Sequence, residues 1–127
     1  MSVKKHYRGT SEYNAVFARL VKAAKDETTV TYIDLALASR LPTKGKYMAD
    51  TISNVLREVT DECFNKNIPL LSCLVVRYDS ELPGEGFFEM LKSSFASWDD
   101  AGFKFPTDDA REVFAKQEMQ SNYKYWS

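Results

Sequence analysis

The residues best suited to chemistry in this chain are two cysteines and one histidine. Cys63 and Cys73 occupy apolar positions of a predicted helix and of a predicted apolar strand, and His6 is remote from both in sequence. A cysteine nucleophile needs a base or a positive neighbour, and zinc needs clustered Cys and His ligands. We therefore predict two reduced core cysteines, no catalytic residue and no enzyme activity.

A second group of reactive side chains is a turn rich in carboxylates, formed by Asp79, Glu81, Glu85 and Glu89. Such oxygens suit Mg²⁺ or Ca²⁺, but their spacing matches neither an EF-hand nor a nuclease pattern. The sequence favours a solvated acidic turn, so no metal and no cofactor is predicted.

A third group could bind nucleic acid. Lys and Arg can hold phosphates, and Asn can contact an adenine edge. The candidates of these types are Lys44, Lys46, Asn54, Arg57 and Arg77. The net charge of −1 and the acids near the same predicted helix and turn oppose a strongly DNA-binding surface.

A fourth group is the aromatic C-terminus, Tyr123, Tyr125 and Trp126. Exposed Tyr and Trp are common anchors of protein interfaces, so these residues are candidates for contact with a protein partner. The alternative is that Trp126 folds back onto the first helix. Both a monomer and a homodimer remain open.

Length and composition set the frame for these candidates. A chain of 127 residues with 44% hydrophobic and 28% charged residues is typical of one soluble domain. No apolar run approaches the roughly 20 residues of a membrane-spanning helix, and no apolar signal region follows the basic N-terminus. We expect a cytoplasmic protein that does not enter a membrane.

The first half of the chain predicts three helices. Residues 11–25 follow amphipathic spacing after a capping Thr10. A capping box at Thr31 and Asp34 opens a short helix to about Arg40, burying Ile33, Leu35, Ala36 or their neighbours. A longer helix follows from about residue 48 to 64, before Pro69.

The second half predicts a strand, a turn and two helices. The apolar run from Leu70 to Val76 is bounded by breakers and indicates a buried strand. Pro83, Gly84 and Gly86 indicate a sharp turn. The remaining features are a helix carrying Phe88, Leu91, Phe95 and Trp98, an extended stretch at 103–106, and a last helix capped by Thr107, with Val113, Phe114 and Met119, before the aromatic tail.

The segment from Val30 to Gly86 resembles a known family. Val30–Ala36, Ile68-Pro69, Val75-Val76 and Pro83-Gly84 are similar to the DNA-binding domain of O6-alkylguanine alkyltransferases and of their non-catalytic alkyltransferase-like relatives. The resemblance implies a winged helix and assigns Tyr32 a contact to a phosphate. Leu70 and Leu71 stand where the family has its nucleophilic Cys and the following His. Asp50 stands near the place of its base-stack arginine.

The prediction is thus an α+β domain spanning residues 1–127. Residues 10–88 would form a winged-helix-like core of three helices with a small antiparallel sheet and a wing, and residues 89–127 would add two helices. The predicted function is a non-enzymatic module that contacts DNA through the third helix and the adjacent loop. The alternative is a protein-binding or inhibitor module that uses the acidic wing and the aromatic tail, because the region from Pro69 to Phe88 also resembles small bacterial and phage proteins.

Overall fold

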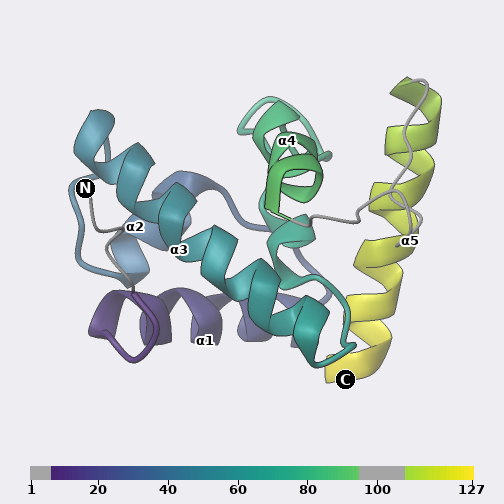
Figure 1. Ribbon diagram of the computed structural model, residues 1–127, viewed down its shortest axis with the longest axis horizontal. Helices are drawn as coiled ribbons and strands as arrows, with labels where there is room; N and C mark the ends of the chain where they lie inside the picture. The colour runs from purple at the N-terminus through teal and green to yellow at the C-terminus, as the bar shows by residue number, and fades with distance from the viewer. Residues whose placement is uncertain (1–6, 95–107) are drawn as a thin grey trace.

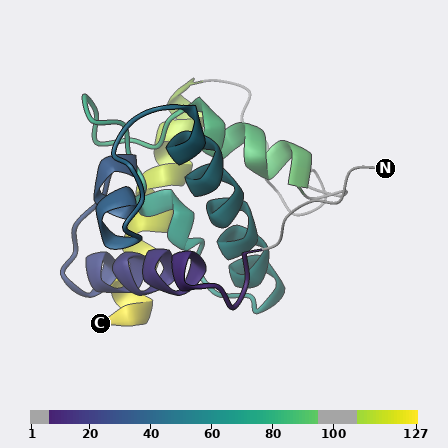
Figure 2. The same cartoon turned by 90° about the vertical axis from the view of Figure 1, so that its left-hand side faces the viewer.

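The computed structural model describes residues 7–94 and 108–127, and helices dominate them. In chain order the elements are α1 (Ser11–Lys25), α2 (Tyr32–Ala38), α3 (Lys46–Asn65), the 3-10 helix η1 (Leu71–Leu74), α4 (Glu85–Ser94) and α5 (Asp108–Trp126). Figure 1 shows α1 along the bottom, α3 crossing above it and α5 upright at the right. In Figure 2 α4 lies near the top, far from α1.

The first three helices confirm the predicted order and the predicted caps. The Thr10 hydroxyl accepts the Tyr13 N–H at 3.2 Å at the start of α1. Both bonds of the capping box open α2, since the Thr31 N–H donates to Asp34 at 2.9 Å and the Asp34 N–H donates to the Thr31 hydroxyl at 3.3 Å. On α2, Leu35 is buried as predicted, whereas Ile33 is 47% exposed.

The predicted central strand is wrong. Residues Leu71–Leu74 form one turn of 3-10 helix, closed by the Cys73 N–H donating to the Leu70 carbonyl at 3.1 Å. Among the described residues, extended pairing is limited to a parallel bridge, in which the Val30 N–H donates to the Leu74 carbonyl at 2.9 Å and the Val76 N–H donates to the Val30 carbonyl at 2.8 Å. An unbroken apolar run does not by itself distinguish a buried strand from a buried helical turn.

Helix α5 supplies hydrogen-bond partners for the backbone at the start of the apolar run, so no partner strand is required at Leu70. The Leu70 N–H donates to the Glu118 carboxylate at 3.0 Å, and the Asn122 side-chain amide donates to the Leu70 carbonyl at 3.0 Å. The Cys73 thiol donates to the Ala115 carbonyl at 3.3 Å. Buried backbone groups must find partners, and here helical side chains supply them in place of a sheet ladder.

The predicted α+β class and winged-helix core are therefore wrong. The described residues contain no β-strand and no antiparallel sheet. In place of a wing hairpin, the chain turns through the Ser80 N–H donating to the Arg77 carbonyl at 3.1 Å and the Arg77 N–H donating to the Leu82 carbonyl at 3.3 Å. The turn then leads directly into α4.

The C-terminal region contains the two added helices that the sequence indicated. Helix α4 begins at Glu85, and helix α5 continues through Trp126, so the residues expected in a tail belong to a helix. Side chains of α5 join the same core as α1 and α3, including the buried Ala115 and Met119. The features predicted at Phe95, Trp98, residues 103–106 and Thr107 lie outside the described residues.

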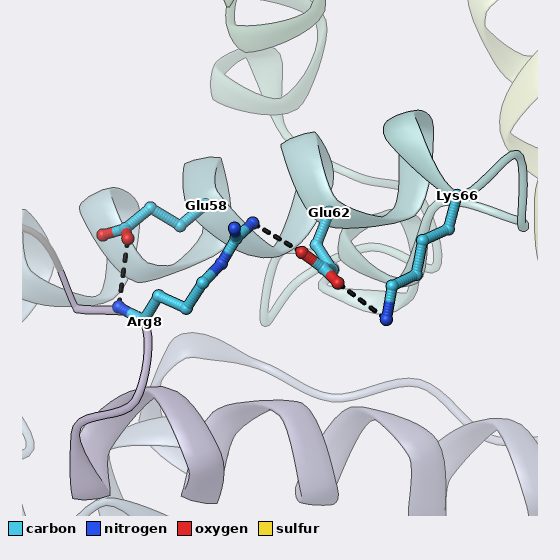
Figure 3. Close-up of polar contacts among 4 residues, drawn as sticks. All are labelled: Arg8, Glu58, Glu62 and Lys66. Atoms are coloured by element: carbon cyan, nitrogen blue, oxygen red, sulfur yellow. Dashed lines mark hydrogen bonds and ion pairs between the residues drawn. The ribbon is translucent and has the colours of Figure 1, made fainter.

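Carboxylates of α3 hold the segment that precedes α1. The Glu58 carboxylate accepts the Tyr7 N–H at 2.7 Å and the Arg8 N–H at 3.0 Å. Glu62 pairs with the Arg8 guanidinium at 2.5 Å and with the Lys66 ammonium at 2.7 Å. Figure 3 shows Arg8 lying between the two carboxylates. These contacts hold Tyr7 and Arg8, which precede α1, against the surface of α3.

Among the described residues, no helix combines the length and apolarity needed to cross a membrane.

Candidate functional site

An open pocket of about 570 Å³ lies between α2, α3, the segment after η1 and the start of α4. Three of the six predicted nucleic-acid-binding residues line it, namely Tyr32, Arg57 and Arg77. They come from three different elements and are 25 and 20 residues apart in the sequence. The fold therefore brings together three of the predicted residues that are far apart in the sequence.

The apolar wall of the pocket includes Val75, Val76 and Phe87. The bridge to Val30 fixes the two valines. Phe87 is buried and packs edge-on against Phe88, with ring centroids 5.1 Å apart. The wall is thus held by neighbours behind it, as expected for a preformed site.

Tyr32 joins α2 to α3 at the edge of this pocket. Its hydroxyl and the Ser53 hydroxyl are 3.0 Å apart and share a hydrogen bond. The ring is partly buried and packs against the core. Packing therefore holds the Tyr32 ring while its hydroxyl stays at the pocket, bonded to a residue of α3.

The two guanidinium groups of the pocket are held differently. Arg77 pairs with Asp79 at 3.3 Å, and its stem passes over Gly84, where an added Cβ would lie 3.2 Å from the Arg77 Cγ. Arg57 is exposed on α3, and no ion pair joins it to another described residue. Of the two arginines that line the pocket, Arg57 is therefore the one without an ion-pair partner among the described residues.

The other predicted nucleic-acid contacts lie outside the pocket, near the start of α3 and along its exposed face. Lys44 precedes the helix, and Lys46 pairs with Asp50 at 3.8 Å one turn further on. Asn54 is exposed two turns after Lys46. Asp50 and Asp79 thus interrupt the positive charge between Lys46, Arg57 and Arg77.

The aromatic C-terminal residues lie elsewhere in the molecule. Trp126 packs edge-on against Phe17 of α1, with ring centroids 6.4 Å apart, and Tyr123 packs against the core. Tyr125 is exposed. Trp126 therefore folds back onto the first helix, which was the alternative to an exposed anchor.

Several residues of the pocket were not predicted as site residues. Ser53, Val76, Gly86 and Phe87 line the pocket beside the predicted ones. The signal that could have found them is Gly86 directly before Phe87, because a residue without a side chain next to an aromatic ring leaves open space. Tyr78, which also lines the pocket, is 89% exposed.

The two cysteines are free and buried in the core, as predicted. Burial raises the pKa of the Cys63 thiol and of the Cys73 thiol above the ordinary range. Both are therefore protonated at neutral pH, the form in which cysteine is a poor nucleophile.

Comparison of the chain with protein-family models, with curated proteins and with solved structures finds no match.

Proposed function

We propose that the protein is a non-enzymatic binding module that contacts DNA along the exposed face of α3. The observation that carries the proposal is the spacing of Lys46, Asn54 and Arg57, which share one exposed side of the helix. This side ends at the pocket, where Ser53 bonds to Tyr32.

The length and chemistry of this face suit a DNA groove. Arg57 follows Lys46 by eleven positions, which corresponds to about 16 Å along the helix axis and about five base-pair steps. The ammonium and guanidinium groups at the two ends would hold phosphates, and Asn54 between them would contact a base edge.

The mixture of positive and negative charge on this face of α3 favours a modest affinity for DNA. Asp50 lies between the cations and would repel phosphate, while Lys44, Lys46 and Arg57 would attract it. Three phosphate contacts correspond to a slope of log K against log salt of about −2.7 for duplex DNA. We therefore expect binding that is measurable at low salt and weak at physiological salt.

The test is fluorescence anisotropy with labelled duplex and single-stranded DNA at both salt concentrations. Arg57→Glu should abolish binding, and Asp50→Asn should strengthen it, because the first change removes a phosphate contact and the second removes a repulsion. Lys25→Glu is the matched control, since Lys25 is an exposed cation on α1, which contributes nothing to the α3 face.

Two results would contradict the proposal. One is the absence of binding by the wild-type chain at low salt. The other is equal weakening by Arg57→Glu and Lys25→Glu, which would reveal an effect of net charge alone.

A protein ligand is the second candidate function, and a different observation favours it. Leu37 of α2 is 63% exposed, and Ile33, one helical turn before it, is 47% exposed. Tyr47, near the start of α3, is also 63% exposed. Apolar side chains gathered on a surface are typical of interfaces. A partner held there should be lost with Leu37→Glu and retained with Val113→Glu, a matched change at an exposed apolar position of α5.

A further inference from the structure

The pocket beside α3 has the size and the wall of a small-molecule site. Its volume of about 570 Å³ falls in the range of about 300–1,000 Å³ typical of such sites. Phe87 presents a buried ring, and Phe114 behind it stacks at 6.4 Å between ring centroids. A planar apolar group could therefore enter without displacing the wall.

The polar side chains of the pocket select for negative charge. Arg57 and Arg77 line it, and Glu89 is the one acid among its described lining residues. Arg77 already has Asp79 as a partner, whereas Arg57 has no ion pair with the described residues. One guanidinium is thus available to an anionic group at the edge of an apolar cavity, where such a contact is strong.

We infer that this pocket binds a small organic anion with a planar aromatic body. The body lies against Val76 and Phe87, and a carboxylate, sulfonate or phosphate group contacts Arg57. This inference goes beyond DNA contact, because the ligand occupies the cavity and not the outer face of α3.

The test uses the full chain and two probes that differ in charge. 8-Anilino-1-naphthalenesulfonate (ANS) carries the anionic group and the aromatic body, and N-phenyl-1-naphthylamine has the same body without the charge. Both fluoresce on entering an apolar site. We expect saturable one-site binding of the anionic probe, with an affinity about tenfold above that of the neutral probe, the value of one charge-assisted hydrogen bond.

Gly86 lines the pocket, so a side chain added there tests whether the probe occupies the cavity. A Cβ added there meets no atom within 4 Å, and the residue has no left-handed backbone angle, so Gly86→Leu inserts a side chain into open space without strain. Its position in α4 also makes Leu a better helix former than Gly. We expect at least about a tenfold loss of ANS affinity, with urea unfolding confirming that the variant is folded.

Ser121→Leu is the matched control, because Ser121 is exposed on α5, which does not line the pocket. It should bind ANS as the wild type does. Unchanged ANS affinity in Gly86→Leu would overturn the inference, because the probe would then bind elsewhere.

Arg57→Gln tests the charge preference. It should weaken ANS about tenfold and leave the neutral probe unchanged. Equal losses for both probes, or none for ANS, would overturn the assignment of an anion.

The small-molecule site and the DNA contact can fail separately. Asp50 does not line the pocket, so Asp50→Asn should alter DNA affinity and leave ANS affinity unchanged. A single-stranded oligonucleotide that displaces ANS completely, and whose own binding is lost in Gly86→Leu, would assign the cavity to a nucleotide of a nucleic acid. That result would overturn the inference of a free small anion.

Discussion

The two ends of the apolar run after Pro69 differ in what covers them. Residues Leu71–Leu74 are buried against α1, α3 and α5, and the Cys73 thiol donates to the Ala115 carbonyl of α5. Val75 and Val76, directly after them, form the wall of an open pocket. One continuous stretch of similar residues thus builds a closed core at one end and the wall of an open pocket at the other. The difference teaches that residue type decides burial, whereas the neighbouring helices decide whether a cavity remains.

The largest expected effect tests the closed end. Leu74→Ala should lower the free energy of unfolding by about 2–5 kcal/mol, because a buried side chain is lost and a cavity remains. Leu37→Ala, the same change at an exposed position of α2, should cost less than about 0.5 kcal/mol. Urea unfolding of both variants measures the contrast. Similar losses would show that the enclosure of Leu74 adds nothing to its contribution to stability.

The next effect tests the polar link between α5 and the apolar run. Asn122→Ala should destabilise by about 1–3 kcal/mol, because the buried Leu70 carbonyl loses the amide that donates to it. Gln120→Ala on the exposed side of α5 is the control and should change stability by less than about 0.5 kcal/mol. Thermal unfolding followed by circular dichroism compares the two. An unaffected melting temperature in Asn122→Ala would show that the hydrogen bond from Asn122 to Leu70 does not stabilise the fold.

A smaller effect on stability is expected for two carboxylates, Glu118 beside the closed end and Glu62 on the surface of α3. Burial raises the pKa of Glu118, against the opposing effect of its bond to Leu70. The hydrogen bond from Lys66 and the charge of Arg8 hold the pKa of Glu62 below its ordinary value of 4.5. At neutral pH, Glu118→Gln should therefore raise stability, and Glu62→Gln should lower it by less than about 1 kcal/mol.

The stability contributions of Glu118 and Glu62 depend on pH in opposite ways, because the pKa of Glu118 is raised and the pKa of Glu62 is lowered. The native state takes up a proton at Glu118 more readily than the unfolded state, so the cost of its charge is absent below pH 4.5 and develops as pH rises through the raised pKa. The stabilisation from Glu62 is present above 4.5 and is lost as pH falls through the lowered pKa. Urea unfolding from pH 3 to 7 measures both, and the same sign for the two variants at pH 7 would contradict this assignment.

The smallest expected effect tests the open end. Arg57→Glu should leave the free energy of unfolding within about 0.5 kcal/mol of the wild type, because Arg57 is exposed and has no ion pair with the described residues. Its effect should appear in ligand binding alone. A large loss of stability in this variant would mean that Arg57 supports the fold. Loss of binding could then result from unfolding and not from the loss of a contact between Arg57 and the ligand.

Local features of this chain could be predicted from the sequence because local interactions produce them. The helix at Ser11–Lys25 matched residue for residue, and the capping box at Thr31 formed, since a side chain and a backbone group a few residues apart determine each. The buried face of α3, with Ile52, Val55 and Val59, followed from its spacing in the same way. Arg57 and Arg77 were singled out by residue type and Tyr32 by the family resemblance, but nothing local indicated that they share one cavity.

The sequence by itself thus determined the helices, their caps and the core positions of both cysteines. Only the tertiary structure decided that Leu71–Leu74 forms a 3-10 turn, because Glu118 and Asn122, 48 and 52 residues after Leu70, satisfy its backbone groups. The tertiary structure also placed Trp126 against Phe17 and left the pocket open beside Val76. Each of these outcomes depends on contacts between residues far apart in the chain, which no local pattern of residues encodes.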